Sequence, residues 1–196
     1  MSRSGRSRLH TACMAAGFVL IAASLMLLAW WQYAIHAAIS HNEACVAMLR
    51  SLTPNPQPAI AEKRTDNTMA AFSFDGTDYL GVLEMPAHGS ALPVAAGWTN
   101  PANHPCRYSG SVHDGSLIIG ASAQKGQYDF YRQISVGDML YLTDVTGSRY
   151  AYRVSDILYR THADASTLTS VEAELTLFIK NPYAFEYILV YCDAMG

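Results

Sequence analysis

The strongest pattern in the chain is an apolar run near the N-terminus. No Asp, Glu, Lys or Arg occurs between Arg8 and Glu43, and Cys13–Tyr33 is almost continuously apolar. A helix of about 20 such residues is long enough to cross a bilayer. A cleaved export signal has a shorter apolar core, of about 7–15 residues, so the pattern favours a retained anchor. We therefore predict an N-terminal segment over residues 1–10 and a transmembrane helix over residues 11–34.

The residues that flank this run indicate its orientation. Arg3, Arg6 and Arg8 precede it with no acid among them, which predicts a cytoplasmic N-terminus. Trp30 and Trp31 lie at its other end, where aromatic side chains mark a membrane interface. The expected arrangement is a single-pass protein of the cell membrane, with its C-terminal domain extracellular.

Two short segments are expected between the anchor and the globular part. In residues 35–52, Ala44, Met48 and Leu52 recur at helical spacing, which predicts a juxtamembrane helix. Residues 53–77 are rich in Pro, Ala and Asn, with three prolines on alternate positions. Because proline lacks a backbone N–H, we expect this stretch to be an irregular linker.

From residue 78 onward the pattern changes to short β-type runs separated by turn residues. A turn at Thr146-Gly147 separates two alternating runs and predicts a hairpin. The pattern as a whole predicts an all-β domain over residues 78–196, either a barrel or a sandwich. The expected strands are Tyr79–Glu84, Leu92–Ala95, Ser116–Ala121, Met139–Thr143, Arg149–Leu158, Glu174–Ile179 and Tyr187–Cys192.

Charge and cysteine content exclude several functions. Without the three N-terminal arginines, ten of the 13 basic side chains remain against 16 acidic ones, so the exported part carries a net charge near −6 and nucleic acid is not an expected partner. The cysteines show no spacing typical of a metal site, and we expect neither a metal nor a cofactor. Cys106 and Cys192 are either a disulfide or two separate buried thiols, and their separation in sequence does not decide between them.

Four segments, in order and spacing, resemble the sortases, the cysteine transpeptidases that attach surface proteins to the Gram-positive cell wall. The likeness is to the class B-like branch and covers roughly residues 79–192. It implies a closed β-barrel of about eight strands with short helices, and a cleft for an extended sorting peptide. The matching segments are Tyr79–Val94, His104–Gly120, Ile134–Val154 and Glu174–Phe178.

Sortase chemistry needs a thiolate that attacks the peptide carbonyl, a histidine that transfers protons and an arginine that stabilises the developing oxyanion. The resemblance places these three roles on positions where the residues differ. Ser122 stands in place of the histidine, Lys180 in place of the cysteine and Tyr187 in place of the arginine. His88 and His113 lie in turn-like settings, which predicts solvated loop residues.

These substitutions lead to three hypotheses. The first is an inactive sortase, or pseudoenzyme, that binds or positions a peptide or the tail of a surface protein. The second is an acyl transferase or hydrolase that uses Ser122 and Lys180, which requires Lys180 to be buried, desolvated and neutral near pH 7. The third is a sortase with a relocated thiol, for which Cys45, Cys106 and Cys192 are the exported candidates.

Overall fold

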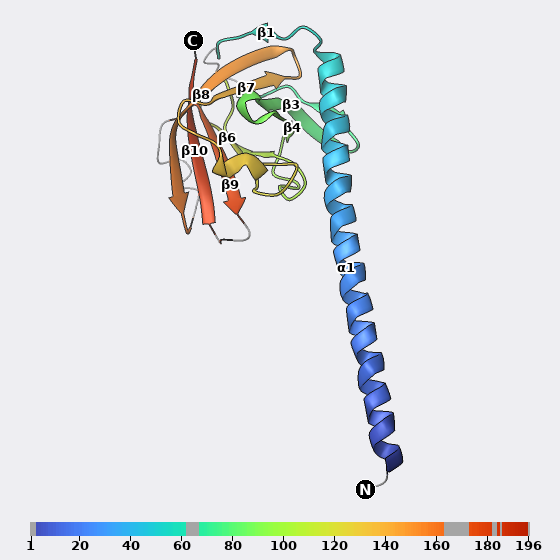
Figure 1. The fold of residues 1–196 in the computed structure, drawn as a ribbon. Coiled ribbons are helices and arrows are strands. Elements are labelled where there is room, and N and C mark those ends of the chain that lie inside the picture. The colour runs from blue at the N-terminus through green and yellow to red at the C-terminus, as the bar shows by residue number, and fades with distance from the viewer. Residues whose placement is uncertain (1–2, 62–66, 163–172, 182–183, 185, 196) are drawn as a thin grey trace. The chain divides into compact units, whose positions relative to one another are not determined.

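The structure is a computed structural model that describes residues 3–61, 67–162, 173–181, 184 and 186–195 (Figure 1). It divides into two compact units. The first unit ends at Ala37 and is helical, and the second begins at Ala38 and contains the end of the same helix and all the strands.

Helix α1 (Arg3–Leu52) is continuous, so the expected anchor and juxtamembrane helix form one element. It contains a stretch, beginning at Cys13, that is long and apolar enough to cross a membrane and has exposed side chains. This confirms the prediction of one N-terminal helix able to span a bilayer. The helix ends before Pro54, since a proline disfavours helical geometry in the residue before it.

The last turns of α1 pack on the strands through one face. Cys45, Val46 and Leu49 are buried, whereas Ala44, Met48 and Leu52 are exposed. The helical spacing of Ala44, Met48 and Leu52 correctly predicts a helix, and these three residues lie on its exposed side. Small and apolar residues surround this part of the helix, so composition does not identify the face that meets the sheet.

Eight strands close into a barrel in the order β8-β10-β9-β6-β5-β4-β3-β7, and β7 pairs with both β3 and β8 to complete the circle. All seven expected strands are present, and β5 was missed. A 3₁₀ helix, η1 (Pro86–His88), links β3 to β4, and η2 (Asp129–Arg132) lies between β6 and β7. The barrel strands are β3 (Thr77–Met85), β4 (Ser90–Ala95), β5 (Cys106–Ser109), β6 (Leu117–Ser122), β7 (Met139–Asp144), β8 (Ser148–Arg160), β9 (Leu175–Asn181) and β10 (Glu186–Ala194).

The predicted hairpin is confirmed as β7 and β8, and its turn has a local physical cause. Gly147 adopts a φ of 90°, which glycine accommodates without steric cost. One carboxylate oxygen of Asp144 accepts hydrogen bonds from the backbone N–H groups of Thr146 and Ser148, both at 2.9 Å. These bonds fix the turn, and with it the register of β7 against β8.

The stretch expected as a linker contains two short strands, β1 (Gln57–Pro58) and β2 (Phe72–Phe74). β1 runs along the edge of β8: the N–H groups of Gln57 and Ala59 donate to the carbonyls of Gly147 and Arg149 at 2.8 and 3.0 Å. The prolines occupy the alternate positions, where the missing N–H would not face the sheet. Alternating prolines are therefore compatible with an edge strand.

Candidate functional site

Ser122, Lys180 and Tyr187, to which the resemblance assigns the three catalytic positions, lie side by side on neighbouring strands. Ser122 of β6 is in register with Lys180 of β9, and Lys180 is in register with Tyr187 of β10. Sequence separates Ser122 from the other two by more than 50 residues. The parallel pairing of β6 with β9 brings them together at the same end of both strands.

These three positions belong to the outer face of the barrel. On β9, Leu177 and Ile179 lie in the interior core, whereas Phe178 belongs to a separate cluster outside it. Side chains alternate between the two faces of a strand, so Lys180 lies on the same side as Phe178. Residues in register share a face, which places Ser122 and Tyr187 on this outer side as well.

Ser122 is held firmly by its backbone. Its N–H donates to the side-chain oxygen of Gln127 at 3.0 Å, and its carbonyl accepts from the N–H of Tyr128 at 3.3 Å. The residue is only 7% exposed. Within the described part of the chain, no histidine or carboxylate contacts its hydroxyl, so we see no base that would activate it as a nucleophile.

Lys180 is exposed, although Ile179 and Asn181 on either side of it are buried. Its ammonium forms no ion pair with the described residues. The hypothesis of a Ser-Lys catalyst requires a desolvated lysine, and an exposed side chain does not meet that requirement. The arrangement instead presents a positive charge to solvent beside Ser122.

An open hollow of about 640 Å³ lies beside these positions. It adjoins the ends of β8, β9 and β10. Its size falls within the range typical of small-ligand and peptide sites. The hollow is lined by Thr161, His162, Lys180, Asn181, Ala184, Glu186 and Tyr187.

A row of four aromatic rings extends across the same outer face. Tyr187 stacks on Phe178 with ring centroids 5.3 Å apart, Phe178 is 6.4 Å from Trp98, and Trp98 meets Tyr108 edge to face at 5.3 Å. Trp98 rests over Gly120, where an added Cβ would lie 2.5 Å from the indole. We call these four residues the aromatic row. Trp98 lies in a loop, and no pattern in the sequence indicates that it contacts this face.

The cysteines do not provide a relocated nucleophile. Cys106 lies in the cluster under α1 and Cys192 in the barrel interior, and both are free thiols, so the alternative of two separate buried thiols holds. Burial raises the pKa of each of these two thiols. Since the thiolate is the nucleophile, a raised pKa suppresses the reactive form. Cys45 is also buried in the cluster under α1.

His104 lies beside Cys106 in this cluster, and we expect it to make folding sensitive to acid. Its ring packs edge to face on Tyr79 at 5.5 Å, and neither ring nitrogen has a partner among the described residues. Burial, and secondarily the charge of His41, lower the pKa of His104. The folded state therefore holds the ring neutral, and the unfolded chain binds the proton more readily. The free energy of unfolding is therefore unaffected by His104 above about pH 6.5, which is the pKa of histidine in an unfolded chain. It falls as the pH drops from there towards the lower pKa of His104 in the folded state.

Thermal unfolding between pH 7.5 and 5 measures this effect. Wild type should lose stability with a slope of up to about 1.4 kcal/mol per pH unit for this single group. His104→Phe keeps the aromatic packing and should flatten the profile, while His162→Phe, at an exposed position, should leave it unchanged. Equal slopes for wild type and His104→Phe would show that His104 does not carry the acid sensitivity.

His88 differs from the expectation of a solvated loop residue. Its side chain is 8% exposed, its Nε2 lies 3.0 Å from a carboxylate oxygen of Asp138, and its ring stacks on Phe130 at 5.1 Å. Fifty residues separate His88 from Asp138, so no local pattern indicates the pair. His113 is half-buried in the turn before β6.

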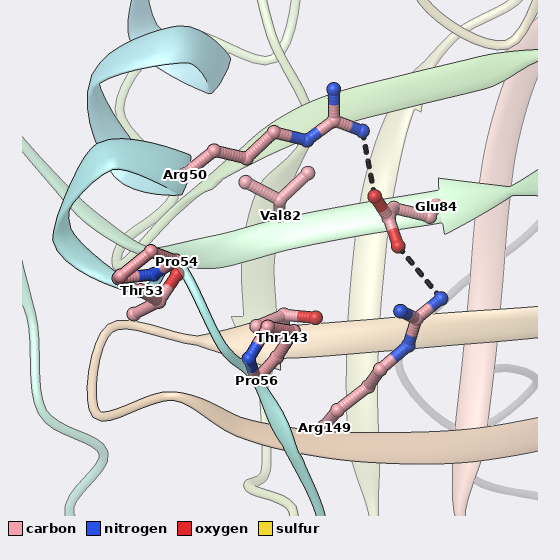
Figure 2. A pocket seen from close by; sticks show the side chains of 8 residues that line it. All are labelled: Arg50, Thr53, Pro54, Pro56, Val82, Glu84, Thr143 and Arg149. Carbon is pink, nitrogen blue, oxygen red and sulfur yellow. Dashed lines mark hydrogen bonds and ion pairs between the residues drawn. The ribbon is translucent and has the colours of Figure 1, made fainter.

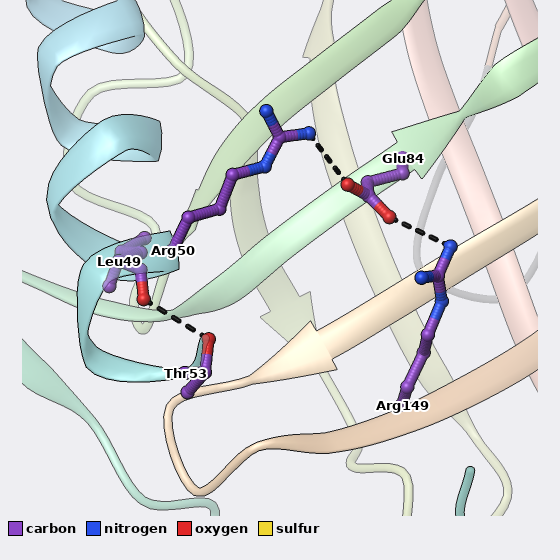
Figure 3. A network of polar contacts seen from close by, with 5 residues as sticks. All are labelled: Leu49, Arg50, Thr53, Glu84 and Arg149. Atoms are coloured by element: carbon purple, nitrogen blue, oxygen red, sulfur yellow. Dashed lines mark hydrogen bonds and ion pairs between the residues drawn. The ribbon is translucent and has the colours of Figure 1, made fainter. Parts of the chain in front are cut away.

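A second group of charged side chains, which includes no residue of the aromatic row, lines a smaller hollow (Figure 2). Arg50 at the end of α1 and Arg149 on β8 approach Glu84 of β3 from two sides, at 2.6 and 2.9 Å (Figure 3). The guanidinium of Arg149 also lies 4.3 Å above the ring of Tyr141. Three elements distant in sequence supply these charges, which explains why sequence reasoning missed them.

Solved structures identify the fold to which this geometry belongs. The pilus-related sortase C of Group B Streptococcus has a TM-score of 0.53 at 18% identity, covering 76% of this chain and 87% of that one. Sortase C of Streptococcus pneumoniae gives 0.52 at 16% identity over 82% and 89%. A sortase D5 transpeptidase of Clostridium perfringens gives 0.51 at 16% identity over 61% and 80%.

The chain therefore has the sortase fold, as its sequence predicted: a closed eight-stranded barrel preceded by an apolar helix able to span a membrane. A likeness at 16–18% identity shows the fold alone. No protein-family model matches the sequence, and comparison with curated proteins gives no match.

Proposed function

We propose that this protein is a membrane-anchored pseudosortase that binds an extended peptide on the outer face of β6, β9 and β10 and does not catalyse transpeptidation. The observation that carries the proposal is the register of Ser122, Lys180 and Tyr187. They stand together on one face, where sortase chemistry would need histidine, cysteine and arginine. A lysine ammonium cannot form a thioester, so the family reaction has no nucleophile at this position.

The outer face has features suited to binding. The aromatic row offers exposed ring surface, with Trp98 and Tyr108 exposed by 44% and 39%. Rings of this kind provide large contact area with little loss of conformational freedom. The adjoining hollow brings Lys180, a positive charge without an ion-pair partner among the described residues, next to this apolar surface. Together they favour an extended peptide that carries apolar and acidic side chains.

The N-terminal sequence supports a location for this domain. Three arginines before the apolar run favour a cytoplasmic N-terminus, which would place the barrel outside the cell. We call the aromatic row and the hollow around Lys180 together the groove. Outside the cell, its natural occupant would be the tail of another surface or cell-wall protein. The pseudosortase would then hold or position that tail for a separate enzyme.

Peptide binding tests this function directly. The full chain in detergent micelles is titrated into labelled extended peptides, sorting motifs with acidic or neutral flanks among them, and fluorescence anisotropy is measured. Tyr187→Ala and Lys180→Gln should each weaken binding by roughly tenfold, equivalent to about 1.4 kcal/mol. Tyr187 contributes ring contact, and Lys180 contributes charge.

Matched control variants distinguish the loss of a peptide contact in the groove from a general effect of the substitution on the protein. Tyr141→Ala and Lys125→Gln remove the same side-chain types at positions that line neither the hollow nor the aromatic row, and both should bind like wild type. If no peptide in the panel binds, or if the control variants weaken binding as much as the groove variants do, the proposed function is wrong.

A further inference from the structure

The hollow around Arg50 and Arg149 is built from the end of α1, the segment that follows it, and strands β3, β7 and β8, all within the second unit. Its volume is about 200 Å³, which accommodates a small ion or a single ligand group. Figure 2 shows the two guanidinium groups pointing into the same space from opposite sides, with Glu84 between them. It is lined by Arg50, Thr53, Pro54, Pro56, Val82, Glu84, Thr143 and Arg149.

The charge of this hollow is opposite to that of the rest of the domain. Arg50 and Arg149 bring two positive charges and Glu84 brings one negative charge, so the lining is positive by one. The whole chain has a net charge of −3. A concave positive site on an acidic protein raises the local concentration of anions and is not explained by general solubility.

The two arginines have hydrogen-bonding capacity that Glu84 does not use. Each guanidinium has five N–H donors, and one nitrogen of each contacts a different oxygen of Glu84. The Nε of Arg149 is buried and has no partner among the described residues. The stacking of Arg149 on Tyr141 fixes the orientation of this donor. The N–H groups that Glu84 leaves unused on the two guanidiniums are the donors that the hollow presents to an anion.

From these observations we propose that Arg50 and Arg149 form a binding site for a phosphate group. The tetrahedral oxygens of phosphate can accept from two guanidinium forks that approach from different sides, and arginine is the preferred side chain for this bidentate contact. A carboxylate has only two oxygens, which suffice for one bidentate fork or, as in Glu84, for a single contact to each arginine. The phosphate is either a free ion or a phosphodiester of an anionic polymer.

This site is independent of the peptide groove. None of its lining residues belongs to the aromatic row or to the hollow around Lys180. Phosphate binding can therefore be present in a protein that binds no peptide, and the reverse also holds. The two proposals fail separately.

Calorimetric titration of the full chain in maltoside micelles tests the proposal with two probes, inorganic phosphate and an oligomer of glycerol phosphate. We expect saturable binding of at least one probe, with a Kd of roughly 1 mM or lower. The tighter probe identifies the source of the phosphate group. Acetate at the same concentration should not compete.

Four variants report on the geometry of the site. Arg149→Gln should weaken binding at least about tenfold, and Arg149→Lys should also weaken it because a point charge replaces the fork. Arg153→Gln, an exposed arginine on the same strand, is the matched control and should bind like wild type. Glu84→Gln should strengthen binding severalfold, since it removes the carboxylate that repels the anion.

The response of Glu84→Gln distinguishes a ligand site from a purely structural ion network. A structural network would lose stability in this variant and gain no affinity. Thermal unfolding of each variant verifies that it is folded, and Arg50→Gln replaces Arg149→Gln if the latter does not fold. Absence of saturable binding by wild type, or equal binding by wild type and the arginine variants, overturns the proposal.

Discussion

A chain that combines Ser122→His, Lys180→Cys and Tyr187→Arg is expected to form a thioester with a sorting peptide, whereas wild type forms none. The register of β6, β9 and β10 places the three new side chains on adjacent positions of one face. The introduced thiolate would attack the peptide carbonyl, the C–N bond would break, and the new histidine would give its proton to the departing amine. An amine acceptor would then release the acyl group.

The measurement is turnover of a panel of fluorogenic sorting peptides with an amine acceptor, together with mass spectrometry of the acylated protein. We expect a rate at least about tenfold above background but far below that of an evolved enzyme, because a misplacement of about 1 Å costs about 100-fold. The same chain with Lys180→Ala in place of Lys180→Cys lacks the thiol and should show no acylation. A folded triple variant that is never acylated would show that the groove geometry is not that of a sortase.

The wild-type arm of this assay also tests the Ser-Lys alternative. Ser122→Ala and Lys180→Ala are assayed beside wild type. Turnover by wild type that disappears in both variants would establish a Ser-Lys catalyst on this fold and would refute the pseudosortase. The exposure of Lys180 leads us to expect no turnover in any of the three.

The second large effect is on stability: Leu177→Ala is expected to lower the free energy of unfolding by about 2–5 kcal/mol. Leu177 is fully buried in the barrel interior, one residue from Phe178, which lies on the outer face. Truncation removes buried apolar surface and leaves a cavity, which the residues of the closed barrel cannot fill by moving inward. Tyr159→Ala, at a position that is 52% exposed on β8, should cost less than about 0.5 kcal/mol.

Chemical denaturation of the full chain, followed by the circular dichroism of the strands, measures this difference. Equal midpoints for Leu177→Ala and wild type would mean that β9 is not packed with Leu177 inward. The assignment of Lys180 to the outer face would then be wrong as well, because a one-residue slip in a strand reverses every side chain.

The sequence does not indicate which face of β6, β9 and β10 points into the barrel. The strand patterns around Ile118, Leu177 and Leu189 are strongly apolar on both faces, so alternation does not reveal which side is inward. These strands are apolar on both faces because both faces are buried. Ile118, Phe178 and Leu189 pack together in a cluster outside the barrel. Hydrophobic patterning finds such strands readily but does not orient them.

The strands that escaped prediction were those with weak local signals. β1 and β2 are two and three residues long, β1 contains a proline, and β5 has four residues and follows a loop. Each pairs with a longer strand: β1 with β8, β2 with β3, and β5 with β6. Such pairing is a property of the partner as much as of the segment itself.

The sequence by itself determined the apolar helix, seven of the barrel strands and the β7–β8 hairpin, because each depends on local composition or spacing along the chain. Only the tertiary structure decided that Lys180 is exposed, that His88 pairs with Asp138, and that Arg50, Glu84 and Arg149 meet in one hollow. Burial and ion pairing depend on which distant segments become neighbours, and closure of the barrel sets those distances.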